Sequence, residues 1–368
     1  MSEERRLILW LLVFAALAAF VYILRGALFP FIAGMAVAYL LDPVADWLER
    51  RGLPRLVASL LIVSVFILAL AAVLVVLVPI LIDQLMDLIA RAPGYIDNVR
   101  REVTPILRKI RANLTPGQAA QIDEAIRSHV GDLIGWIGTI VSGIVSGGAA
   151  LLGILGLMFI MPFVAFYMIR DWDRLIAYID SLLPSKGGDT IRLLAREIDD
   201  RLSGFVRGQS LVCLLLGAWY ATGLTLVGLD FALLLGIGAG ILSIIPYLGN
   251  IVGLGTSLLL ALAQFDGWVR MALVAAVFIS GQALEGNLVT PKIVGDRVGL
   301  HPVWLLFAVT AGTALLGITG ALLAVPTAAA MGVLIRFAVQ RYRESPLYAE
   351  DDDGGTGAVR AVDSSEGR

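Results

Sequence analysis

Repeated apolar runs of about 18 or more residues constrain this chain more than any other feature. A run of that length matches the hydrocarbon core of a bilayer and predicts a membrane helix. The composition agrees, because 58% of the 368 residues are hydrophobic and only 16% are charged. Polar side chains are too few to cover the surface of a soluble protein of this size. We therefore predict an all-α polytopic membrane protein.

About eight membrane segments are expected. They cover residues 7–24, 28–47, 56–82, 133–169, 208–228, 231–263, 268–290 and 303–336. Two polar regions with the periodicity of amphipathic helices, 83–132 and 170–207, are inserted between them. We expect one membrane domain over residues 1–343 and a disordered acidic tail over 344–368.

Basic residues in short loops predict the orientation of the chain. They form three groups: Arg5 and Arg6; Arg50, Arg51 and Arg55; and Arg336, Arg341 and Arg343. An arrangement with both termini in the cytoplasm places all three groups on the cytoplasmic side. Strict alternation of the segments then places 83–132 outside and 170–207 inside. A cleaved signal peptide is the alternative for the first segment, but its apolar run is too long for one.

Two of the membrane segments are too long to be single straight helices. Segment 231–263 would measure about 50 Å as a continuous helix, against about 30 Å for the hydrocarbon core. Pro246 and Gly249 lie near its middle, and 303–336 is also interrupted by glycines and Pro326. Each segment is therefore expected to be broken or re-entrant. The sequence leaves open whether they cross the membrane or turn back.

The two broken segments also resemble each other, because a glycine precedes a proline by six positions in both (Gly240 to Pro246 and Gly320 to Pro326). A third pair, Gly156 to Pro162, has the same spacing. The alternatives are an internal repeat and a coincidence among leucine- and glycine-rich segments. Paired interrupted segments are the best sequence indication of a transporter's binding site.

The polar stretch 285–302 joins two apolar segments. Glu285 still belongs to an apolar run, where a carboxylate is costly unless it lies in a wet cavity or beside a cation such as Lys292. Gln282 and Asn287 add hydrogen-bonding side chains. These groups fit a gate or polar site at the membrane boundary. The alternative is an ordinary loop that satisfies its own polar groups.

This stretch resembles the hallmark of the autoinducer-2 exporter (AI-2E) family, also called the PerM-type permeases. The matching residues are Glu285, Gly286, Asn287, Leu288, Pro291, Lys292, Ile293, Gly295, Leu300, His301, Pro302, Gly312, Gly317, Gly320 and Pro326. Further landmarks are Arg207, Gly208 and Gln209, and Ile245 to Gly249. Asn250 stands where the family usually has proline. The resemblance covers residues 7 to 340.

The resemblance implies an inner-membrane protein of about eight helices. Activities linked to the family are export of a furanone signal and, in some members, sodium– or lithium–proton antiport. The expected partners are the lipid bilayer and a small solute or a cation with a proton. Many members have no established substrate, so the resemblance leaves the substrate of this chain open.

The sequence gives less support to other classes of function. The sequence has no phosphate-binding loop, no H-E-x-x-H motif and no G-x-S-x-G elbow, so we expect no enzyme, no metal and no cofactor. The net charge of −2 argues against nucleic acid as a partner. A non-transporting scaffold remains the rival to a transporter. Small residues such as Gly143 and Gly147 would suit close helix packing or a homo-oligomer.

Two sets of candidate residues follow. A transport path would use Glu285, Asn287, Gln282, Gln209, Arg207 and Lys292, with Asn250 and Tyr247 as further polar groups. The backbone of the path would be shaped by Pro246, Gly249, Pro291, Gly295, Pro302, Gly317, Gly320 and Pro326.

Overall fold

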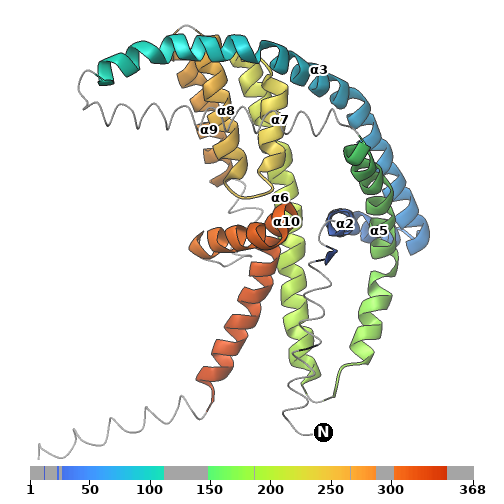
Figure 1. Cartoon of the computed structure of the whole chain (residues 1–368). Helices are drawn as coiled ribbons and strands as arrows, with labels where there is room; N and C mark the ends of the chain where they lie inside the picture. Colours follow the sequence, from blue (N-terminus) through green and yellow to red (C-terminus); the bar gives the residue numbers. More distant parts are fainter. Residues whose placement is uncertain are drawn as a thin grey trace, which may run out of the picture. The chain divides into compact units, whose positions relative to one another are not determined.

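The computed structural model describes residues 12, 23–24, 27–111, 148–185, 187–265, 267–286 and 302–345. Regular structure in these residues is helical throughout, which confirms the all-α prediction (Figure 1). The helices are α2 (Leu28–Arg50), α3 (Arg55–Arg111), α5 (Gly148–Ser181), α6 (Gly188–Val227), α7 (Ala232–Leu242), α8 (Leu248–Gln264), α9 (Trp268–Leu284) and α10 (Pro302–Arg343). Most of the predicted segment 7–24 and the tail beyond 345 lie outside the described residues.

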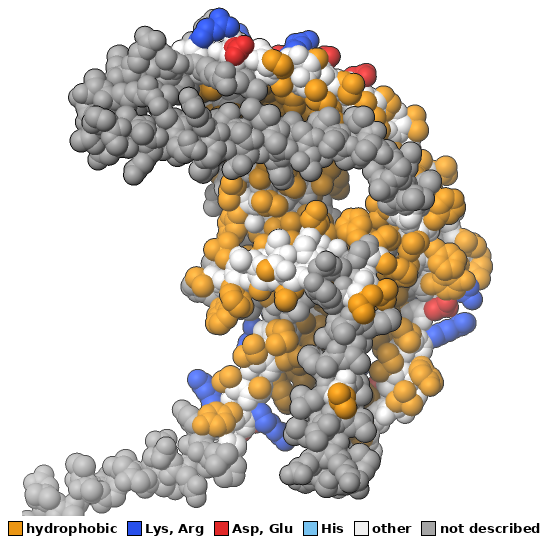
Figure 2. Space-filling view, viewed as in Figure 1, with side chains coloured by type: hydrophobic (Ala, Val, Ile, Leu, Met, Phe, Trp, Pro, Cys, Tyr) orange, Lys and Arg blue, Asp and Glu red, His pale blue; other side chains and the backbone are white. Residues whose placement is uncertain are grey.

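Four of the described helices are long and apolar enough to cross a membrane. They are α2, α3 up to Val99, α6, and α10 from Val303, while α7, α8 and α9 are shorter apolar helices. Large apolar side chains such as Leu68, Val75 and Leu214 are about 70% exposed, and Figure 2 shows such side chains over much of the visible face. Exposed apolar surface of this extent suits contact with lipid and confirms a polytopic membrane protein.

The helices continue through positions where the hydropathy changes. The 57 residues of α3 combine the apolar run 56–82 with the polar residues after it, and α6 joins the polar residues 188–207 to the apolar ones that follow. Pro79 and Pro93 lie within α3, which bends along its length (Figure 1). A proline removes one helix hydrogen bond and commonly bends a long helix instead of ending it.

Segment 231–263 is a helical hairpin. Between α7 and α8 lies the hairpin tip, residues 243–247, where Tyr247 has the left-handed φ of 68°. At the other end, the Gln264 amide donates to the Gly228 carbonyl oxygen (3.0 Å) and its Oε1 accepts from the Asp230 N–H (2.8 Å). The start of α7 and the end of α8 are therefore together, so this segment turns back.

The second half of α3 lies across this end of the hairpin (Figure 1). Gln84 Oε1 accepts from the Leu234 N–H, one of the free donors in the first turn of α7 (3.0 Å). The Tyr95 hydroxyl donates to Asp230 (2.7 Å), and the Asn98 amide donates to the Ala263 carbonyl oxygen (3.0 Å). α3 thus holds the ends of both hairpin helices.

Segment 303–336 is broken at Gly317, which has φ 63° and ψ −140°. A Cβ built on Gly320 would lie 1.9 Å from the Gly312 carbonyl oxygen. These residues would be about 12 Å apart along a continuous helix, so α10 bends sharply between them. Pro326 lies inside helix beyond the bend, as Pro162 does in α5. Only Pro246 borders a break, so the three glycine–proline pairs share no local structure.

Glycines bring the hairpin against α6 at backbone distance. A Cβ on Gly240 would lie 2.3 Å from the Cα of Gly217, and one on Gly236 would lie 2.2 Å from the Ala221 nitrogen. At these two positions the backbones of α7 and α6 are in direct contact. The core around this contact includes Leu216, Tyr220, Leu224 and Phe278, all at most 1% exposed.

The described chain forms two compact units. The first contains residues 1–177 and 206–294, and the second contains 178–205 and 295–368. In the second unit, Glu197 pairs with Arg201 (2.7 Å) and with Arg336 of α10 (3.8 Å). This ion pair links the polar half of α6 to α10.

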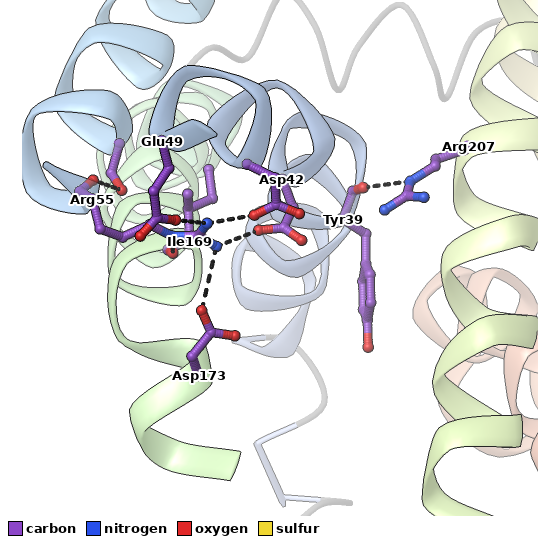
Figure 3. A network of polar contacts seen from close by, with 9 residues as sticks. Tyr39, Asp42, Glu49, Arg55, Ile169, Asp173 and Arg207 are labelled. Carbon is purple, nitrogen blue, oxygen red and sulfur yellow. Dashed lines mark hydrogen bonds and ion pairs between the residues drawn. The ribbon is translucent and has the colours of Figure 1, made fainter. Parts of the chain in front are cut away.

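Arg55 connects three helices of the first unit at one end of α2 (Figure 3). Its guanidinium pairs with Asp42, Asp46 and Glu49 of α2, and its Nε donates to the Ile169 carbonyl oxygen of α5 (2.9 Å). The sequence analysis used Arg55 only as an indicator of orientation. The structure places it in the packing of α2, α3 and α5.

Arg207 compensates for a proline in α2. Pro43 has no N–H, so the carbonyl oxygen of Tyr39, four residues earlier, loses its helix partner. Arg207 Nε donates to that oxygen at 2.9 Å (Figure 3). The contact joins α6 to α2 at the point where the hydrogen bonding of α2 is interrupted.

We expect Gly240→Ala to destabilise the protein, because the new methyl group would meet the backbone of Gly217. The cost should be about 1–3 kcal/mol, as for other overpacked sites. The matched control is Gly238→Ala in the same helix, where a Cβ meets no atom within 4 Å. The control should be neutral or stabilising. Thermal unfolding in detergent measures both, and equal midpoints for the two variants would contradict the close packing of α6 and α7.

A double-mutant cycle tests the role of Arg207. Arg207→Ala should cost about 1–3 kcal/mol, because the Tyr39 oxygen loses the hydrogen bond from Arg207. Pro43→Ala restores the N–H that this oxygen needs, so Arg207→Ala should cost at least about 1 kcal/mol less in that background. Any loss of long-range charge attraction occurs in both backgrounds and cancels.

Pro162→Ala in α5 is the matched control for this cycle. The same cycle with Pro162→Ala should be additive, because Arg207 makes its contact with α2. Unfolding free energies measured by denaturant titration decide the outcome. Additivity in the Pro43 cycle would show that Arg207 does not replace the missing N–H.

Candidate functional site

Three polar side chains from α8 and α9 form a hydrogen-bonded chain in the first unit. Asn250 Nδ2 donates to Gln282 Oε1 at 2.6 Å, and Gln282 Nε2 donates to Glu285 Oε2 at 3.1 Å. Gln282 and Glu285 lie at the end of α9, where the helix widens to π geometry at Glu285 and Gly286. Such π turns occur frequently at functional sites. We call Asn250, Gln282 and Glu285 the amide–carboxylate site.

The carboxylate determines how the two amides are oriented. An ionised carboxylate only accepts hydrogen bonds, so Gln282 directs its NH₂ group toward Glu285 and its oxygen toward Asn250. Asn250 then directs its own NH₂ group toward Gln282. Its Oδ1 is buried and accepts no hydrogen bond from the residues that the structure describes. Among the described residues, the site therefore contains a buried acceptor without a partner, joined to the carboxylate through Gln282.

A groove of about 440 Å³ opens at this site. Its apolar walls come from α8 and α9, and its polar groups come from Asn250 and Gln282. The lining residues are Asn250, Leu254, Phe278, Ile279, Gln282, Ala283 and Gly286. Apolar walls with a few convergent polar groups are typical of sites for small molecules.

Tyr220 of α6 extends the polar groups into the core. Its ring stacks on Phe278 with centroids 4.5 Å apart, and a Cβ on Gly281 would lie 2.9 Å from its hydroxyl. The side chain is fully buried, and its hydroxyl has no hydrogen-bond partner in the described chain. Buried tyrosine hydroxyls usually have a partner, so this group is a further candidate for solute contact. The sequence analysis missed it because Tyr220 lies within an apolar segment.

Gln209 holds the hairpin tip. It is 8% exposed, and its Nε2 donates to the Ser243 carbonyl oxygen at 2.5 Å. Gly249 allows the return of the chain, because a Cβ there would lie 2.2 Å from Ser243 Oγ. Pro246 thus lies in the hairpin tip, Gln209 and Gly249 lie against it at Ser243, and Arg207 belongs to the contact with α2 described above.

The remaining predicted site residues lie elsewhere. Gly317, Gly320 and Pro326 lie in α10, which begins at Pro302. Asn287, Pro291, Lys292 and Gly295 lie outside the described residues. The structure therefore brings together Gln282, Glu285 and Asn250, all three of which were named from the sequence. Within the described residues, no group of three or more histidine, cysteine or acidic side chains is arranged to hold a metal.

Known proteins resemble this chain along most of its length. A *Bacillus subtilis* protein described as a transport protein, YrrI, is 32% identical over 313 residues, which cover 85% of this chain and 87% of the relative. The permease PerM of *Escherichia coli* is 26% identical over 321 residues, covering 86% of this chain and 88% of PerM. A *Mycobacterium tuberculosis* transport protein, MT0215, is 28% identical over 324 residues, covering 87% and 86%.

The sequence model that describes AI-2E family transporters matches residues 11–340, nearly the whole chain. The match includes α2 to α9, the polar stretch 285–302 and α10 up to residue 340. The chain belongs to the AI-2E family of transporters.

Proposed function

We propose that this protein exports or exchanges a small polar solute across the cell inner membrane, with the amide–carboxylate site as a contact point. The observation that carries the proposal concerns Asn250, which lines an open groove and is linked through Gln282 to the Glu285 carboxylate. Its buried Oδ1 has no hydrogen-bond partner among the described residues. A buried acceptor without a partner costs about 1–3 kcal/mol. A solute that donates a hydrogen bond would recover that cost on binding.

The geometry of the groove supports a solute with several hydrogen-bond donors. Asn250 and Gln282 line the groove, and Glu285 adds a carboxylate bound to Gln282, while the apolar wall of the groove would contact a carbon skeleton. A small hydroxylated molecule has both features. The exporter activity linked to the family resemblance is consistent with this chemistry.

The hairpin tip is the proposed gate. It is a short break between two helices, and side-chain contacts such as that of Gln209 with the Ser243 carbonyl hold it. The opposite end of the hairpin is held by Gln264 and by three residues of α3. A movement that exposes the groove is therefore expected at the tip.

Exchange of a sodium or lithium ion for a proton is the second candidate. Glu285 favours it, because this carboxylate has no cationic partner among the described residues and hydrogen-bonds to Gln282. A carboxylate near an apolar segment can bind a cation or a proton in turn. The proposal also places both termini of the chain in the cytoplasm and takes the protein to be a homo-oligomer. A scaffold without transport is the rival that it must exclude.

Flux through the purified protein in proteoliposomes tests these candidates. With a proton gradient imposed, we would add sodium, lithium or the furanone signal and follow internal pH and solute uptake. Asn250→Ala should lower solute flux about tenfold or more, because it removes the acceptor and breaks the hydrogen-bonded chain. Asn98→Ala, which removes the contact with Ala263 at the other end of the hairpin, is the matched control and should retain more flux.

Glu285→Gln separates the two candidates. Glutamine keeps the size of the side chain but cannot exchange a proton at neutral pH. Proton release driven by sodium or lithium should be abolished if Glu285 is the exchanging group. Furanone movement that survives the substitution would favour the exporter. No flux of any solute through folded wild-type protein would favour the scaffold.

A further inference from the structure

The last two turns of α2 separate charged side chains onto opposite faces. Asp42, Asp46 and Glu49 are spaced by four and three residues, so they share one face of the helix. All three pair with Arg55. These carboxylates are therefore engaged on the side of α2 that packs against the protein.

The opposite face carries Val44, Trp47 and Arg51, spaced by three and four residues. Val44 is 46% exposed and Trp47 is 45% exposed. The Arg51 guanidinium lies over the Trp47 ring, 4.0 Å from its centroid. This stacking holds the cation beside the exposed apolar surface.

Arg50 and Arg51 pair with no carboxylate among the residues that the structure describes. The acidic groups closest to them in the sequence are the ones bound to Arg55. Both arginines lie where α2, a helix long enough to cross the membrane, ends at the turn containing Gly52. Two cations without acidic partners therefore lie next to an exposed tryptophan at a helix end.

We propose that Val44, Trp47, Arg50 and Arg51 bind the headgroup and upper acyl chain of an anionic phospholipid. Guanidinium groups bind phosphate oxygens with two parallel hydrogen bonds. Tryptophan is favoured at the level of lipid headgroups, and Val44 continues the apolar surface toward the acyl chain. We call these residues the α2 lipid site. It is independent of the proposed transport function.

A lipid explains these observations better than a soluble anion or a protein partner. A soluble phosphate would use the arginines but would not cover Val44 and Trp47. An acidic protein segment would have to approach a surface that lies along a membrane helix. A phospholipid supplies both the phosphate and the hydrocarbon in the required order.

Quenching of Trp47 by brominated lipids tests the α2 lipid site in the full-length protein. Vesicles would contain equal fractions of brominated phosphatidylglycerol or brominated phosphatidylcholine. The signal of Trp47 is the difference between wild type and Trp47→Phe. We expect phosphatidylglycerol to occupy the site at least about fivefold more strongly, because each arginine near an anionic surface contributes an effect of about that size.

Arg50→Gln combined with Arg51→Gln should remove this preference. The matched control is Arg341→Gln combined with Arg343→Gln, which removes the same charge from the last turn of α10 and should preserve it. Arg51→Gln alone should reduce the preference for phosphatidylglycerol. This single variant replaces the double variant in the test if the double variant does not fold. Inorganic phosphate at about ten times the lipid concentration should not displace the lipid.

Three results would overturn the proposal. Equal quenching of wild-type Trp47 by the two lipids would show that the site does not select anionic headgroups. An equal loss in the control variant would show only general charge attraction. Displacement of the lipid by inorganic phosphate would indicate an anion site that does not require the acyl chain.

Discussion

Backbone carbonyl groups need hydrogen-bond partners wherever a membrane helix is interrupted, since lipid offers none. In the part of the chain that the structure describes, side chains supply partners at three interruptions. Arg207 donates to the Tyr39 oxygen, for which Pro43 has no N–H. Gln209 donates to the Ser243 oxygen at the hairpin tip, and Gln264 donates to the Gly228 oxygen beyond α6. Two of these donors are only two residues apart in α6. The arrangement of α2 and the hairpin around α6 depends on them.

The membrane character, the helical class and the presence of a break at residues 243–247 could be predicted from the sequence. Long apolar runs and a proline within an over-long segment are local signals. A membrane helix follows from the length of an apolar run, and a break follows from the hydrogen bond that proline removes. The helix ends were less predictable. A change in hydropathy does not end a helix, and α3 and α6 continue through such changes. The direction after the break depends on Gln264 and on glycine contacts distant in the sequence.

The candidate site was only partly predictable for the same reason. Gln282 and Glu285 were named because they are polar groups at the end of an apolar run. Asn250 lies 32 residues before Gln282, and the packing of α8 against α9 brings the two together. Tyr220 was missed because its position in an apolar segment is ordinary, whereas its unpartnered hydroxyl is visible only in three dimensions. Arg207 was assigned to a path, and the structure gives it a backbone partner in α2.

The contact between Gly240 and Gly217 also affects how α7 can move. Interdigitated side chains between two helices resist sliding, because each must change rotamer before the helices can shift. α7 and α6 meet there through backbone atoms alone. Such a smooth surface allows small shear displacements of one helix along another. Once the hydrogen bond from Gln209 to the Ser243 carbonyl is released, the tip of the hairpin can therefore shift along α6 while its opposite end stays anchored by α3.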